Sequence, residues 1–339
     1  MIAWLRPRRA SAPHAAPAQG HASESAPAEQ HLRRLEWTVI QRLDGLLLGD
    51  WRTLMRGSGL DLADLREYQP HDDVRHIDWN LTARLQQPHV RVFAEDREMN
   101  AWFLLDLSPS VDFGSGARRK RDVSADLVAV LARLFTRRGN RVGALLYGSG
   151  VEQRVPARSG RAHVLQLMHR IQQRPAAPGE PGTTRLAELL QAADRIVRRR
   201  STLFVVSDFI SEPGWQAPLG RLAQRHEVVA VRLTDPLEQG LPDLGLITLR
   251  DAESGEQLMV DTRDRAFRRR FAALAAEREA AVRAALACAG VDALELSTDD
   301  DLAGALLRFA ALRRQRARLA AAGGALTVPP TAQAGVQAA

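Results

Sequence analysis

Apolar residues follow two alternating patterns from residue 101 onward. Short continuous apolar runs are typical of strands buried on both faces, whereas apolar residues recurring every three or four positions are typical of helices. The pattern predicts strands at 101–105, 142–147, 151–155, 202–207, 227–233 and 291–296. It predicts helices at about 119–138, 160–173, 184–199, 213–225, 264–287 and 299–318. The alternation indicates an α/β fold over residues 101–318, with a doubly wound, mostly parallel sheet covered on both faces.

Two further short runs, at 246–249 and 257–260, interrupt this alternation. Neighbouring short strands joined by a turn predict a hairpin, here inserted at about 243–261. The run at 151–155 is less apolar than the other strands, so we expect this strand at an edge of the sheet.

The chain before residue 101 has a different pattern. Apolar residues at helical spacing from Leu32 to Leu48 predict one amphipathic helix that ends near Gly49. Residues 56–100 are dense in charge, Gly, Pro, Asp and His, and predict irregular structure apart from a strand at 89–93. We therefore treat 29–100 as an N-terminal helix followed by an irregular charged segment. The two ends, 1–28 and 319–339, are rich in Ala, Gly and Pro, and we expect them to be disordered.

Composition excludes several classes of protein. The 339 residues are 45% hydrophobic and 26% charged, close to the averages for globular proteins, which excludes a fibrous or fully disordered chain. The single cysteine, Cys288, excludes an internal disulfide and a thiolate metal cluster. No apolar run approaches the roughly 20 residues of a membrane helix, so we expect no membrane span and a cytoplasmic location.

The charge of +7 comes almost entirely from arginine, because Lys120 is the only lysine among 47 basic residues. Residues 56–100 carry six arginines and nine acids, so the basic excess lies elsewhere. The basic clusters at 118–121, 198–200, 268–270 and 313–318 fall mostly on predicted helices, where they are interleaved with apolar positions. This arrangement is typical of solvated helix faces, so no nucleic-acid partner is expected, although nucleic-acid binding stays an alternative.

Oxygen-bearing side chains gather where the predicted parallel strands end. Asp106, Ser108 and Ser110 follow the strand at 101–105, and Asp208 follows the strand at 202–207. Thr184 begins a predicted helix between them. Ligands of doubly wound sheets bind beyond the carboxyl ends of the strands, and a set of oxygen ligands suits Mg²⁺. The same residues are also common caps of turns and helices, which is the structural alternative.

The pattern Asp106-x-Ser108-x-Ser110, with a later Thr and the strand-end Asp208, resembles the metal-ion-dependent adhesion site of von Willebrand factor A domains. The resemblance implies that Ser108, Ser110 and Thr184 bind a weakly held Mg²⁺ or Mn²⁺ directly. Asp106 and Asp208 would act directly or through water, and one position would stay open for an acidic group of a partner. Thr183 is the alternative to Thr184.

Residues 57–98 carry a second fingerprint. The run from Gly57 to Pro70, then Asp72 to Asn80, and then 82–84 and 95–98, resembles the domain of unknown function 58 family. The resemblance covers about 50–318, and His71 departs from it where glycine is expected. It implies the shorter type without membrane helices, joined to a von Willebrand factor A-like sheet. Similar proteins are paired with a MoxR-type AAA+ ATPase, so we expect a non-catalytic adaptor that helps this ATPase to remodel, assemble or insert metal into a client protein.

Two questions stay open at this point. The acids and arginines of the fingerprint suit ion pairs that lock the segment, but His71, Asp72, Asp73, His76 and Asp78 are an alternative catalytic or metal set. We expect Trp79 and Trp102 in the core. A Mg²⁺-dependent hydrolase or phosphotransferase is the alternative function, but the sequence has no Walker A loop and no Gly-x-Ser-x-Gly elbow. The acids nearest the site in sequence are Asp112 and Glu212.

Overall fold

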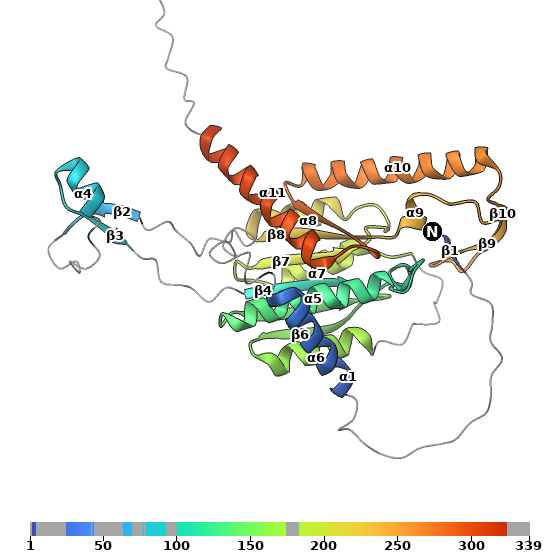
Figure 1. Ribbon diagram of the computed structural model, residues 1–339, viewed down its shortest axis with the longest axis horizontal. Coiled ribbons are helices and arrows are strands. Elements are labelled where there is room, and N and C mark those ends of the chain that lie inside the picture. The colour runs from blue at the N-terminus through green and yellow to red at the C-terminus, as the bar shows by residue number, and fades with distance from the viewer. Residues whose placement is uncertain are drawn as a thin grey trace, which may run out of the picture.

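The central element is a six-stranded sheet (Figure 1). The computed structural model describes residues 2–4, 25–41, 43, 64–69, 77, 79–92, 100–173 and 183–323. The strands are β4 (Asn100–Asp106), β5 (Arg141–Tyr147), β6 (Val151–Arg158), β7 (Thr202–Ser207), β8 (Glu227–Thr234) and β11 (Asp292–Ser297). Their order is β11-β8-β7-β4-β5-β6, and only the edge strand β6 runs antiparallel to its neighbour. The predicted fold class, including the edge position of the strand after residue 150, is confirmed.

The four central strands, β4, β5, β7 and β8, are buried on both faces, as the continuous apolar runs predict. Along β4, Phe103 and Leu105 join the core on one face, while Trp102 and Leu104 join the core on the other. The Phe103 ring stacks on Phe204 of β7, with ring centroids 5.2 Å apart. In the part of the chain that the structure describes, no helix is both long enough and apolar enough to cross a membrane.

Helices cover each face of the sheet (Figure 1). The first face packs against α1 (Ser25–Leu35), α5 (Lys120–Arg137), α6 (Arg161–Gln172) and α11 (Leu302–Gly323). The second face packs against α7 (Leu186–Ile196), α8 (Gln216–Arg225) and the last turns of α10 (Arg265–Cys288). The N-terminal helix α1 and the last helix α11 therefore both pack on the same face of the sheet.

The N-terminal helix starts earlier than predicted. α1 begins at Ser25, inside the expected leader, because Ala28 and Leu32 are buried against the helices of the first face. The helix continues through a π-helical turn, Glu36–Ile40, and Leu43 is also buried. The predicted end near Gly49 lies outside the described residues. At the other end α11 runs to Gly323, so the predicted tail is helical at its start and its remainder, 324–339, lies outside the described residues.

The charged segment contains a small unit of its own. β2 (Asp64–Glu67) pairs antiparallel with β3 (His89–Val92), and α4 (Trp79–Leu85) contacts β3. Trp102 is buried as expected, but the expectation that Trp79 is a core residue is wrong, because 69% of its surface is exposed on this seven-residue helix. The alternative site set, His71, Asp72, Asp73, His76 and Asp78, lies outside the described residues.

The insertion after β8 forms a second small sheet. β9 (Leu246–Asp251) and β10 (Gln257–Asp261) pair antiparallel, and β1 (Ile2–Trp4), which falls in the expected leader, adds to β9 as a third strand. A short helix that the sequence pattern does not predict, α9 (Pro236–Gln239), precedes the hairpin. Leu249 and Val260 of the hairpin pack with Leu241 and α10 in a separate apolar cluster. The hairpin is therefore anchored outside the two main cores.

Candidate functional site

The site lies where the order of the strands reverses along the sheet. From the first strand, β4, the chain continues to β5 and β6 on one side and then to β7, β8 and β11 on the other. The carboxyl ends of β4 and β7 are therefore adjacent, and this is the position at which doubly wound sheets bind ligands. Asp106 is the last residue of β4, and Asp208 directly follows β7.

The end of β4 turns so that three oxygen-bearing side chains come together. The Ser108 amide donates to Asp106 Oδ1 at 3.0 Å, and a single 3₁₀ turn, Pro109–Asp112, follows. The hydroxyls of Ser108 and Ser110 lie 3.0 Å apart and share a hydrogen bond. All three side chains are fully buried. The alternate spacing of Asp106, Ser108 and Ser110 in sequence thus becomes one cluster of oxygens in the structure.

The end of β7 completes the carboxylate pair. Ser207 Oγ donates to Asp106 Oδ2 at 2.7 Å, which links the two strand ends directly. Asp208 Oδ1 accepts a hydrogen bond from the Ile210 amide at 3.0 Å. Phe209, between Asp208 and Ile210, has a φ of 58°, a left-handed conformation that a bulky residue adopts only under constraint. Its amide donates to Ser207 Oγ, and its ring packs on Trp215, which together hold this turn.

Thr184 reaches the site from the start of α7. Its carbonyl accepts hydrogen bonds from Ser211 Oγ and the Glu212 amide, both at 2.9 Å, which ties it to the loop after Asp208. Thr184 is buried, whereas Thr183 is exposed and bonds to the Glu212 carboxylate. Of the two threonines, Thr184 is the one turned inward. The three segments that carry the five predicted site residues thus meet at one edge of the sheet.

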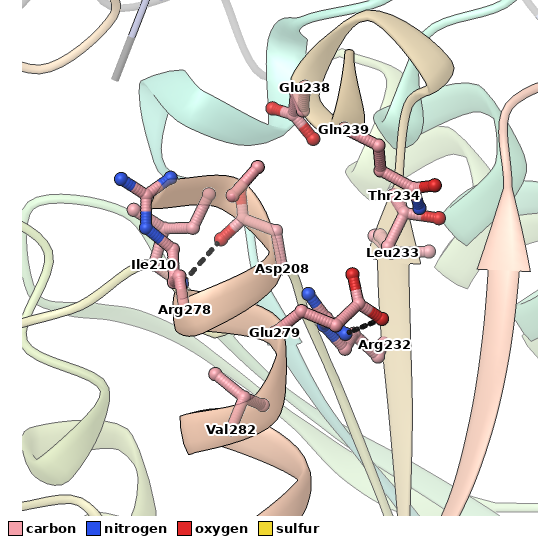
Figure 2. Close-up of a pocket in the computed structure, with 11 residues that line it drawn as sticks. Asp208, Ile210, Arg232, Leu233, Thr234, Glu238, Gln239, Arg278, Glu279 and Val282 are labelled. Carbon is pink, nitrogen blue, oxygen red and sulfur yellow. Dashed lines mark hydrogen bonds and ion pairs between the residues drawn. The ribbon is translucent and has the colours of Figure 1, made fainter. Parts of the chain in front are cut away.

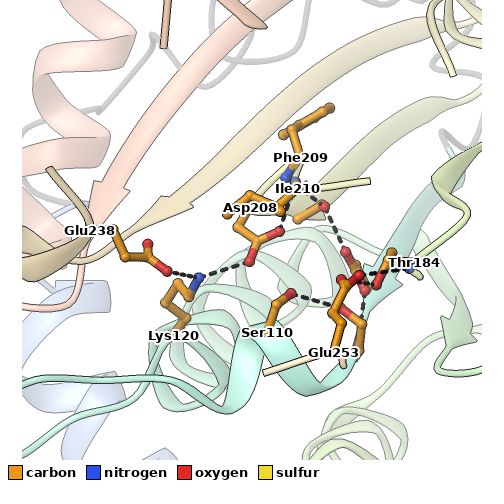
Figure 3. A network of polar contacts seen from close by, with 11 residues as sticks. Ser110, Lys120, Thr184, Asp208, Phe209, Ile210, Glu238 and Glu253 are labelled. Carbon is orange, nitrogen blue, oxygen red and sulfur yellow. Dashed lines mark hydrogen bonds and ion pairs between the residues drawn. The ribbon is translucent and has the colours of Figure 1, made fainter. Parts of the chain in front are cut away.

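Lys120 is a site residue that sequence reasoning missed. The prediction that the cluster at 118–121 lies on a solvated helix face is wrong for Lys120, because its side chain is fully buried at the start of α5. Lys120 Nζ donates to Asp208 Oδ2 and to Glu238 Oε1 of α9, both at 2.8 Å (Figure 3). Burial alone would lower the pKa of Lys120, but the two carboxylates outweigh it and raise the pKa, so the group is an ammonium. One sequence feature could have pointed to it: Lys120 is the only lysine in an arginine-rich chain.

Glu253, at the tip of the β9–β10 hairpin, is the second residue that was missed. Its Oε1 accepts a hydrogen bond from Thr184 Oγ1 at 2.7 Å, and its Oε2 accepts one from the Thr184 amide at 3.2 Å. Figure 3 shows this carboxylate directed at Thr184, beside the cluster that contains Ser110 and Asp208. No local sequence signal indicates this contact, because the two residues are 69 positions apart.

The site has more negative than positive charge. Four carboxylates lie at the site: Lys120 pairs with Asp208 and Glu238, while Asp106 and Glu253 accept hydrogen bonds from Ser207 and Thr184. Burial and the charge of Asp208 raise the pKa of Asp106 to about 6, despite its hydrogen bonds with Ser207 and Ser108. Burial also raises the pKa values of Glu238 and Glu253, and the charge of Asp208 adds to both increases. An additional cation would relieve this repulsion.

The donor set fits a weakly held hard cation. Ligands at about 2.1 Å in octahedral geometry lie about 3.0 Å apart when adjacent, which matches the separation of the Ser108 and Ser110 hydroxyls. Among the described residues, no group of three or more His, Cys, Asp or Glu side chains could hold a metal ion. A cation here would therefore depend on the hydroxyls of Ser108, Ser110 and Thr184, with Asp106 and Asp208 supplying charge.

A pocket adjoins the site on the side of α10. Asp208, Glu238, Arg232, Arg278 and Glu279 contribute to its lining (Figure 2). Arg232 Nη1 donates to Glu279 Oε1 at 2.8 Å, so this wall of the pocket is an ion pair between β8 and α10. The pocket gives access to the Asp208 and Glu238 carboxylates, whereas Glu253 contacts the site at Thr184.

Comparison with known families identifies the chain. A family model described as "Protein of unknown function DUF58" matches residues 64–281. The chain belongs to the DUF58 family. This membership confirms the resemblance stated from the sequence. The sheet topology described above gives this DUF58 protein a doubly wound, mostly parallel α/β fold.

This DUF58 chain has curated relatives in mycobacteria. It is 42% identical over 289 residues to the uncharacterized protein Rv1480 of Mycobacterium tuberculosis, covering 84% of this chain and 90% of the relative. It is 41% identical over 167 residues to the uncharacterized protein MAV169 of Mycobacterium avium, covering 48% of this chain and 96% of the relative.

Solved structures show lower similarity. An aerotolerance-related membrane protein from Bacteroides fragilis matches with a TM-score of 0.42 and 12% identity, covering 64% of this chain and 99% of that chain. The VWA domain of SpRpn10 matches with a TM-score of 0.35 and 15% identity, covering 62% of this chain and 94% of that chain.

Proposed function

We propose that this DUF58 protein is a non-catalytic interaction module whose strand-end site binds Mg²⁺ or Mn²⁺ weakly and, through it, an acidic side chain of a partner protein. The partner would be a MoxR-type AAA+ ATPase, for which the protein acts as an adaptor in remodelling, assembly or metal insertion of a client protein. The single observation that carries the proposal is the buried oxygen cluster at the ends of β4 and β7, where Asp106, Ser108 and Ser110 lie beside Asp208.

The chemistry of this cluster supports a cation more strongly than a purely structural role. Turn-capping side chains normally satisfy backbone amides. Here Asp106 and Asp208 do accept backbone hydrogen bonds, but both are buried and repel each other. Buried charge of one sign is unfavourable unless it is compensated. Lys120 pairs with Asp208, but the charge of Asp208 still raises the pKa of Asp106. A divalent cation held by the neighbouring hydroxyls would compensate it and would leave coordination positions for a partner's carboxylate.

We expect titration calorimetry of the full chain with Mg²⁺ or Mn²⁺ to show weak binding. Replacing Asp106 with alanine is expected to weaken binding by about 10–100-fold, because it removes the charge that supports the ligating hydroxyls. Ser110→Ala is expected to weaken it as well, by removing one proposed ligand with little change in volume.

The matched control is Asp243→Ala, which removes a carboxylate that is largely exposed and lies outside the site. Circular dichroism melting of each variant separates loss of a ligand from loss of the fold. Indistinguishable binding by the original chain, Asp106→Ala and Ser110→Ala would show that the cation is not held here.

The partner is tested separately, by capturing a purified MoxR-type ATPase on the immobilised protein. We expect capture in Mg²⁺ and strong loss of capture in EDTA, because the proposed contact runs through the cation. Capture that is the same with and without EDTA would exclude a contact bridged by metal, and no capture in either buffer would exclude this partner.

No specific observation favours the alternative functions. Asp112 and Glu212, the acids nearest the site in sequence, are bound to Arg121 and Arg185, so neither is positioned as a general base. Several arginines of the basic clusters are also engaged: Arg118 pairs with Asp126, and Arg313 pairs with Glu227 and Asp292. Turnover of simple phosphoesters that is lost in Asp106→Ala would favour the hydrolase instead.

A further inference from the structure

The turn of the β9–β10 hairpin is built to present one carboxylate. Asp251 Oδ1 accepts a hydrogen bond from the Glu253 amide at 2.9 Å, and the Gly255 amide donates to the Asp251 carbonyl at 3.0 Å. Gly255 has a φ of 73°, which glycine adopts without strain. The Asp251 amide closes the turn by donating to the Glu256 carbonyl at 2.8 Å. The position of Glu253 is therefore defined by the turn itself.

This carboxylate is directed at a residue of the strand-end site. Both of its oxygens accept hydrogen bonds from Thr184, one from the hydroxyl and one from the amide. A threonine hydroxyl that donates its proton still has lone pairs, so Thr184 Oγ1 can face a cation and a carboxylate at once. An acidic side chain brought by a partner would need the same position beside Thr184.

We propose that Glu253 is a built-in ligand of the strand-end site, and that a partner's acidic side chain enters only when the β9–β10 hairpin releases this position. The inference rests on the proposed function, because it assumes that the site receives a carboxylate. It assigns the inserted hairpin a role in controlling access.

The anchoring of the hairpin allows such a release. Its buried apolar residues, Leu249 and Val260, pack with Leu241, Phe267 and Phe271 and belong to neither of the two main cores. The hairpin can therefore shift without opening the packing of the six-stranded sheet.

The experiment compares the full chain with Glu253→Gln, Glu253→Ala and the matched control Glu256→Gln. Glu256 is exposed on the same turn, so its variant makes the same change of charge without touching Thr184. Hydrogen exchange is followed by mass spectrometry with and without Mg²⁺. In the original chain and in Glu256→Gln, we expect Mg²⁺ to slow exchange at 252–256 and at 108–113.

In both Glu253 variants, slowing is expected at 108–113 only, because the hairpin no longer supplies a ligand. Equal slowing at 252–256 in these variants would overturn the inference and leave the cation site intact. If Mg²⁺ changes exchange in neither segment of any chain, the proposed function itself fails.

Capture of the MoxR-type ATPase in Mg²⁺ provides the second measurement. Loss of the internal ligand raises the fraction of molecules able to accept a partner, so both Glu253 variants are expected to capture it about 10-fold more tightly than the original chain and Glu256→Gln. If all four proteins bind the ATPase with equal affinity, the hairpin does not compete with the partner and the inference is wrong.

Discussion

Replacing Lys120 with methionine is expected to lower the free energy of unfolding by about 3–5 kcal/mol. The variant keeps most of the side-chain volume but leaves Asp208 and Glu238 buried without their shared ammonium, which lies 2.8 Å from each. Urea denaturation followed by circular dichroism measures the change. An unfolding midpoint equal to that of the original chain would mean that the ion pairs contribute nothing to stability.

A triple variant separates the charge effect from simple loss of packing. Adding Asp208→Asn and Glu238→Gln to Lys120→Met neutralises both carboxylates, and we expect most of the lost stability to return. If the triple variant is no more stable than Lys120→Met alone, the defect comes from packing around the start of α5 and not from unpaired charge.

The second large effect has the opposite sign. Replacing Asp106 with asparagine is expected to stabilise the metal-free protein at pH 7 by about 3 kcal/mol, because the pKa of Asp106 rises from 3.8 to about 6 on folding. Well below pH 3.8 the carboxyl is neutral in both states, so the gain vanishes, and at pH 4 it is already small. Between pH 4 and pH 6 the unfolded state loses its proton first, and the folded state is progressively disfavoured. Urea denaturation of both proteins at pH 4 and pH 7 measures this difference.

Asp235 provides the matched control for Asp106. It is fully buried near the same end of the sheet, but it accepts hydrogen bonds from the Ser115 and Leu237 amides and the Thr298 hydroxyl. Burial opposes its ionisation, yet these hydrogen bonds prevail and lower the pKa of Asp235. Asp235→Asn is therefore expected to destabilise the protein at pH 7. Destabilisation by both variants would show that ionised Asp106 does not destabilise the folded protein.

This contrast indicates how much of the site could be predicted from sequence. Asp106 and Asp208 were found because each directly follows a buried strand, and Ser108 and Ser110 because their spacing suits one turn. The choice of Thr184 over Thr183 depended on where the following helix starts. In the structure Thr184 is buried, whereas Thr183 is exposed. Whether a buried carboxylate is strained like Asp106 or satisfied like Asp235 depends on which amides and hydroxyls surround it, and those come from other segments.

The sequence by itself determined the doubly wound, mostly parallel sheet, its edge strand and the inserted hairpin, because burial on one or both faces leaves a periodic trace in the chain. Only the tertiary structure decided that Lys120 is buried and that Glu253 reaches Thr184. The Lys120 contacts join residues 88 and 118 positions apart, and such long-range pairing leaves no local pattern. An arginine-rich helix start looks solvated in sequence, but the carboxylates of Asp208, after β7, and of Glu238, on α9, pair with its one lysine and make it a buried cation.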